Sequence, residues 1–171
     1  MASDRSHRKL AEKFALVELL GKTVVTDSLL ALVRFTFTEE EAEIVAALGP
    51  APLPVRAVAL KLGRRAVTVR PVLESLAERV LILGLEMKGI PVYAFMPLVP
   101  GVFEAQMIRS RGLPGQRAHF EACARLYGDV HAEYSEILAT QLVDRQVRTS
   151  RIIPIKQSID PNLVDRIAGL S

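Results

Sequence analysis

Apolar residues recur at intervals of three and four along much of the chain, which is the spacing of amphipathic α-helices. The pattern predicts helices over 7–20, 29–35, 38–48, 55–62, 66–79, 102–108 and 116–143. Between residues 81 and 95 it changes to two short apolar runs, separated by Met87–Ile90 with Gly89 at the turn. Such a change predicts a β-hairpin.

Local signals mark where several of these helices begin and end. Thr38 and Glu41 form a capping box, in which each side chain accepts the other's backbone N–H. The proline-rich segment 50–54 is not helical, and Gly63 ends the helix over 55–62. Pro71 has to lie near the first turn of the next helix, because deeper inside it would kink the helix.

The order of helix, short helix, turn, helix and hairpin predicts a mainly α fold with a small β-hairpin. We interpret it as a winged helix-turn-helix flanked by N- and C-terminal helices. The predicted divisions are an N-terminal helix (1–26), the winged helix-turn-helix (27–97), a helical extension with a long helix (98–147) and a tail (148–171). The tail contains a strand-like stretch over 151–155 and a short helix over 162–167.

The composition is that of a globular protein, with 171 residues, 50% hydrophobic and 24% charged. No apolar run approaches the length of a membrane span, and the N-terminus lacks the apolar core of a signal peptide. We therefore expect a cytoplasmic protein with no membrane partner.

The sequence offers no constellation for catalysis, so we expect no enzyme activity, no catalytic residue and no cofactor. His119, Cys123 and His131 lie on one helix at spacings that could hold a metal. We favour core packing of Cys123, the only cysteine, because it lies in an apolar stripe. We expect no metal site, and we expect His7 to be disordered with its terminus.

Basic residues are concentrated in the predicted helix-turn-helix. Residues 54–88 hold seven basic and three acidic residues, whereas the whole chain has 22 Lys and Arg against 19 Asp and Glu. A helix-turn-helix places its second helix in the major groove of DNA, where arginine reads guanine or holds phosphate. The candidate residues for double-stranded DNA are Arg56, Lys61, Arg64, Arg65, Thr68, Arg70 and Lys88.

Three observations oppose DNA binding: Pro71 lies on the presumed groove face, Glu74 and Glu78 repel phosphate, and the wing has a single basic residue, Lys88. The arginines could instead solvate the turn or pair with these glutamates. We interpret the chain as a winged-helix DNA-binding protein, a transcriptional regulator. The alternative is a protein-docking module without DNA binding.

The long helix carries a heptad seam that predicts a homodimer. The N-terminal helix offers a second apolar face near a chain end. The candidate interface residues are Leu10, Phe14, Val17, Phe120, Tyr127, Val130, Tyr134 and Ile137. The alternative is that the long helix folds back over its own hairpin, since Gly128 weakens a continuous seam.

Residues 38–96 resemble a winged helix of the MarR-like kind, whose members dimerise through terminal helices. Three segments, Phe37–Glu43, Tyr93–Met107 and Arg151–Ile155, are also similar to the N-terminal region of ferredoxin-like iron–sulfur proteins of anaerobic bacteria. That second resemblance spans about Leu10 to Ile159, and its middle segment is the most specific.

In that iron–sulfur family, cysteine-rich cluster motifs follow the winged-helix part. This chain has only Cys123, so none of the cluster ligands carries over. The chain is then either part of a longer protein or a stand-alone relative without the redox domain. The resemblance implies a module that accompanies electron-transfer proteins and docks a redox protein partner.

Overall fold

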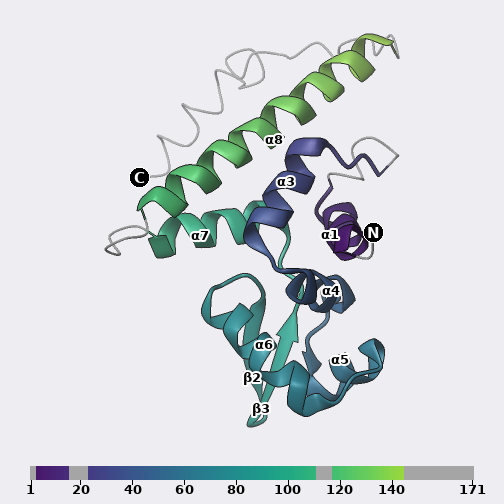
Figure 1. Cartoon of the computed structure of the whole chain (residues 1–171), viewed down its shortest axis with the longest axis vertical. Helices are drawn as coiled ribbons and strands as arrows, with labels where there is room; N and C mark the ends of the chain where they lie inside the picture. Colours follow the sequence, from purple (N-terminus) through teal and green to yellow (C-terminus); the bar gives the residue numbers. More distant parts are fainter. Residues whose placement is uncertain (1–2, 16–22, 111–116, 145–171) are drawn as a thin grey trace, which may run out of the picture. The chain divides into compact units, whose positions relative to one another are not determined.

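A computed structural model describes residues 3–15, 23–110 and 117–144 (Figure 1). The chain divides into two compact units, Met1–Glu136 and Ile137–Ser171. The helices are α1 (Ser3–Phe14), α3 (Asp27–Thr36), α4 (Glu39–Ala47), α5 (Val55–Leu62), α6 (Ala66–Glu78), α7 (Phe103–Ser110) and α8 (Arg117–Asp144). The strands are β1 (Leu53–Pro54), β2 (Leu83–Met87) and β3 (Ile90–Ala94), and one π-helical turn spans Leu98–Val102.

The segment predicted as a winged helix-turn-helix contains α4, β1, α5, α6 and the β2–β3 hairpin (Figure 1). The three strands form an antiparallel sheet in the order β1-β3-β2. The predicted fold class, mainly α with a small hairpin, is confirmed. No helix within 3–15, 23–110 or 117–144 is long and apolar enough to cross a membrane.

Polar side chains cap the N-termini of α3 and α4, and the cap on α4 is the predicted capping box. The Thr26 hydroxyl accepts the amide of Leu29 at 3.2 Å. At the start of α4, the amide of Glu41 donates to the Thr38 hydroxyl at 3.3 Å, and the amide of Thr38 donates to the Glu41 carboxylate at 2.9 Å. Both helices therefore begin where polar side chains satisfy otherwise unpaired N–H groups.

Two glycines and a lysine shape the turns around α5 and the hairpin. Gly63 ends α5 with φ +63°, the left-handed conformation that glycine adopts without penalty. The hairpin turn consists of Lys88 (φ +52°) and Gly89 (φ +75°). A two-residue turn with positive φ at both positions matches the twist of paired strands.

Four sequence-based expectations about helices and strands require correction. Pro71 lies in the second turn of α6, one turn later than expected. Residues 53–54, expected only as part of a non-helical proline-rich segment, form β1. The strand β2 begins at Leu83 rather than 81, because Leu81 and Ile82 are buried in the core. Helix α1 starts at Ser3, four residues before the expected start.

His7 is buried rather than disordered, and its Nε2 donates a hydrogen bond to the carbonyl of Phe37 at 2.9 Å. Lys13, six residues further along α1, donates to the carbonyl of Leu48 and lies 4.9 Å from the centre of the Phe95 ring. Burial, followed by the charges of Lys61 and Lys9, lowers the pKa of Lys13. These contacts fix α1 against α3 and α4, which the amphipathic pattern alone did not show.

The expected strand over 151–155 and helix over 162–167 lie outside the described residues, as does the C-terminal part of the expected first helix, 16–20.

Candidate functional site

The helix-turn-helix buries one side of α6 and exposes the other. Val69, Leu73 and Leu76 are buried at intervals of three and four, so residues between them face outward. Among the predicted DNA-binding residues, Arg64 is half-buried. The other six are exposed, and they are Arg56, Lys61, Arg65, Thr68, Arg70 and Lys88. Lys88 lies in the hairpin turn, as expected.

Arg64 is held by two carboxylates of α4, a contact that the sequence did not predict. Its Nη1 lies 2.7 Å from Glu40 Oε1 and its Nη2 2.5 Å from Glu43 Oε2. The side chain therefore binds the turn between α5 and α6 to the start of α4. No local signal could reveal this pair, because its members lie 24 and 21 residues apart in the chain.

The remaining candidates on α6 are partly neutralised. Arg70 Nη1 lies 3.7 Å from Glu74 Oε1, an exposed pair one turn apart of the kind the sequence suggested as an alternative. The Thr68 hydroxyl donates to the carbonyl of Arg65 at 2.8 Å. Glu78 is also exposed. Positive charge on this helix is consequently confined to its first turns.

Arg56, Lys61 and Arg65 differ from Arg64. None of the three side chains forms an ion pair or a hydrogen bond with any residue of the described segments. Arg56 and Lys61 come from α5, and Arg65 immediately precedes α6. These cations are available to an anionic partner.

The C-terminal end of α6 is tied to two other helices. The Arg79 guanidinium forms an ion pair with Glu41, the same residue that closes the capping box of α4. Gln106 of α7 donates through Nε2 to the carbonyl of Arg79 at 2.5 Å. The orientation of α6 is thus fixed at both ends by polar contacts from α4 and α7.

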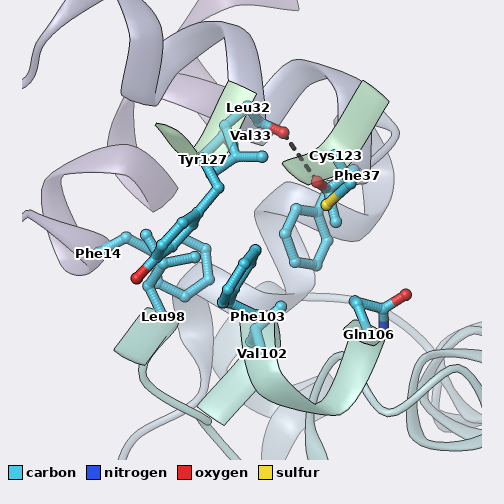
Figure 2. Close-up of a pocket in the computed structure, with 11 residues that line it drawn as sticks. Phe14, Leu32, Val33, Phe37, Leu98, Val102, Phe103, Gln106, Cys123 and Tyr127 are labelled. Carbon is cyan, nitrogen blue, oxygen red and sulfur yellow. Dashed lines mark hydrogen bonds between the residues drawn. The ribbon is translucent and has the colours of Figure 1, made fainter. Parts of the chain in front are cut away.

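A separate apolar pocket lies between α1, α3, α7 and α8 (Figure 2). The space between its lining atoms, counted together with open solvent at its mouth, is about 320 Å³. The lining residues are Phe14, Leu32, Val33, Thr36, Phe37, Leu98, Val102, Phe103, Gln106, Cys123 and Tyr127. Figure 2 shows the aromatic rings of this set gathered around the same space.

The polar groups of the pocket do not form a catalytic arrangement. The Thr36 hydroxyl donates to the carbonyl of Leu32 at 2.8 Å. Burial raises the pKa of the Cys123 thiol, so the less nucleophilic thiol form is favoured at neutral pH. The ring of Tyr127 stacks on Phe103 with centroids 3.6 Å apart. The side chains that line the pocket therefore act mainly in packing.

His119 and Cys123, two of the residues considered for metal binding, contact different parts of the structure. His119 stacks against Phe35 with ring centroids 5.1 Å apart, while Cys123 faces the pocket. Within the described part of the chain, no three His, Cys, Asp or Glu side chains are grouped closely enough to hold a metal ion.

The heptad seam of α8 packs against its own chain. Val130 and Tyr134 are buried, and the Tyr134 hydroxyl donates to the carbonyl of Val24 at 2.5 Å. The Glu133 carboxylate accepts the amide of Ser28 at 3.3 Å. Hydrogen bonds from Thr26 first, and from Ser28, lower the pKa of Glu133.

The other candidate interface residues are placed as follows. Leu10 and Phe14 of α1 are buried, and Phe120 and Tyr127 are half-buried. Val17 lies outside the described residues, and Ile137 belongs to the second unit. A dimer through the buried residues would require these helices to leave the surfaces that cover them in one chain.

The chain matches no protein-family model, no curated protein and no solved structure in the comparisons made.

Proposed function

We propose that this protein binds double-stranded DNA and regulates transcription, with the first turns of α6 in the major groove. The observation that carries the proposal is the exposure of Arg56, Lys61 and Arg65 around the turn of a helix-turn-helix, without ion pairs to the described residues. Unpaired cations at these positions are suited to phosphates and base edges.

The contacts around α6 give the other candidates distinct roles in this proposal. Arg65, Thr68 and Arg70 lie near the end of α6 that would enter the groove, while Lys88 lies at the hairpin turn. Arg64 acts as a positioning residue, since Glu40 and Glu43 hold its guanidinium. Glu74 and Glu78 keep the second half of α6 away from phosphates.

Fluorescence anisotropy against duplex DNA over a series of salt concentrations tests this proposal. Each lost phosphate contact should reduce the slope of log affinity against log salt by about 0.9. We expect weaker binding and a smaller slope in R56A/R65A. The control is R117A, which removes an exposed arginine of α8 that is paired with Glu121.

Two results would contradict DNA binding. The first is no binding at low salt with about 100 μM protein, the upper range of non-specific dissociation constants. The second is an equal effect of R56A/R65A and R117A, since this would show that the contacts are not specific to the helix-turn-helix.

A second candidate is docking to an iron–sulfur electron-transfer protein. It is favoured by the exposed apolar side chains of the hairpin, which include Leu85, Met87 and Ile90. DNA-binding wings usually present charge to the backbone, whereas protein interfaces use apolar surface. Saturable binding of a [4Fe–4S] ferredoxin, without binding of duplex DNA, would favour this candidate over the first.

We also propose a cytoplasmic location and a homodimer. The proposal assigns no reaction and no cofactor to the chain.

A further inference from the structure

Strand β2 is an apolar edge strand whose outer side is uncovered in the described structure. It lies at the end of the sheet order β1-β3-β2, and all five of its residues are exposed. Leu83 is 41% exposed, Leu85 49% and Met87 54%. Natural proteins usually protect such edges with charges, prolines or covering elements, because an open edge pairs with other strands.

The hairpin register shows which backbone groups of β2 point outward. Met87 and Ile90 flank the two-residue turn. In such a turn the N–H of each flanking residue donates a hydrogen bond to the C=O of the other. Alternation along the strand then directs the N–H and C=O groups of Gly84 and Glu86 away from β3. The position of Pro91 opposite Glu86 agrees with this alternation, since proline has no N–H to give to β2.

We propose that β2 pairs antiparallel with β2 of a second copy of this chain, with Leu85 facing Leu85 across the twofold axis. In this register Gly84 lies opposite Glu86 of the second copy, so the outward backbone groups meet in hydrogen-bonded pairs. The leucines then occupy the non-hydrogen-bonded site, where opposing side chains approach most closely. The product is a continuous six-stranded sheet.

The sequence of β2 favours its own copy over an arbitrary strand. The outward N–H and C=O groups of Gly84 and Glu86 must meet those of the second copy. This allows only antiparallel registers in which the twofold axis passes at Gly84, Leu85 or Glu86. Centring on Glu86 places two like charges directly opposite each other, which is destabilising. Centring on Gly84 brings the buried Ile82 opposite Glu86 and leaves Met87 outside the paired strands. Only the register on Leu85 pairs all five residues and sets Leu83 against Met87.

The side-chain directions along β2 also agree with pairing to a second copy of the chain. A side chain at residue 84 would lie 2.8 Å from the Ala77 side chain, so the Gly84 face of β2 lies against α6. Leu83, Leu85 and Met87 alternate with Gly84 and therefore project from the opposite face. Pairing of two copies would join these side chains into one apolar surface across the axis.

The mass of the full chain, measured by light scattering during size-exclusion chromatography, tests the pairing. We expect twice the chain mass of 18.8 kDa for the wild type at about 100 μM, a concentration far above the dissociation constant of a stable interface. L85K places two charges across the axis, and E86P removes an outward N–H while keeping the bonds to β3. Both variants should be monomers. L60K, at a residue of α5 that is 83% exposed, should remain a dimer.

Cysteine cross-linking tests the register without disrupting the strand. In a C123S background, L85C should form a covalent dimer on oxidation because the two residues face each other, while E86C should not. A monomeric wild type overturns the proposal, as does a dimer that L85K leaves intact. A dimer that breaks only on substitution of Tyr134 also overturns it, because it assigns the interface to α8.

Discussion

Helices α5 and α6 end in the same hydrogen-bonded turn but carry different residues at its left-handed position. In α5, the amide of Arg64 donates to the carbonyl of Ala59 at 2.9 Å and that of Gly63 to Leu60 at 3.1 Å. In α6, the amides of Leu81 and Val80 make the equivalent bonds to Leu76 and Ala77, at 2.9 and 3.0 Å. Both turns are Schellman motifs.

The two turns are stabilised in different ways. Glycine at 63 adopts φ +63° at little steric cost, whereas Val80 has φ +57°, which is unfavourable for a β-branched residue. The residue after Val80 is Leu81, which is only 2% exposed, while the residue after Gly63 is Arg64, with its ion pairs. Core burial at the end of α6 thus offsets a backbone penalty that α5 avoids.

The largest effect should follow from L81A, which removes the burial that holds the end of α6. We expect a loss of about 2–5 kcal/mol in the free energy of unfolding, the range for truncating a buried leucine. Urea denaturation measures it. L60A is the control, since that leucine is exposed on α5. A loss no larger than in L60A would mean that Leu81 does not hold this turn.

Next in size is G63V, which gives α5 the strained residue of α6. We expect a loss of about 1–2 kcal/mol in unfolding free energy, because a side chain at φ +63° is strained although no atom lies within 4 Å of its Cβ. The same denaturation series measures it. G128A also adds a Cβ in open space, but within helix α8, and should stabilise by roughly 0.5–1 kcal/mol. If G63V and G128A both lower the unfolding free energy, the positive φ at residue 63 does not explain the loss in G63V.

The reverse exchange, V80G, should raise the unfolding free energy by about 0.5–1 kcal/mol. Relief of the left-handed strain is partly opposed by the greater freedom of glycine in the unfolded chain. V67G, in the first turn of α6 where the backbone is helical, should instead lower stability. Thermal unfolding of both variants gives the signs, and a loss in V80G would show that Val80 packing outweighs its strain.

The smallest effect belongs to the ion pairs after α5. R64A should cost less than about 1 kcal/mol, because ion pairs between partly exposed side chains are weak and screened by salt. A double-mutant cycle of Arg64 and Glu43 at low and high salt measures the coupling. The exposed Arg117–Glu121 pair of α8 provides the comparison. A coupling energy unchanged by salt would argue against an electrostatic origin.

The comparison also shows which features the sequence could predict. Gly63 and the Thr38–Glu41 capping box are local signals, and the helices they delimit were predicted within a few residues. The left-handed Val80 carries no such signal, since its conformation depends on burial of Leu81. Strand β1 was missed for a similar reason, because its pairing with β3 joins residues about forty positions apart.

In the candidate site, too, the features with a local sequence signal were predictable and those that depend on distant contacts were not. The outward positions of α5 and α6 were predictable from periodicity, but the pairing of Arg64 with α4 was not. In α8, the spacing of apolar residues predicted the helix correctly, but could not tell which surface covers it. Within the first unit, the stacking of Tyr127 on Phe103 and the hydrogen bond from Tyr134 to Val24 show that α8 packs against its own chain.

That last hydrogen bond has a consequence for the order of folding. It joins residues 110 positions apart, whereas the contacts among α4, α5, α6 and the hairpin close much shorter loops. Contacts of high sequence separation form slowly, since chain entropy must be lost before they stabilise anything. We therefore expect α8 to dock after the folding transition state. Removing the Tyr134 hydroxyl would then accelerate unfolding and leave the refolding rate nearly unchanged.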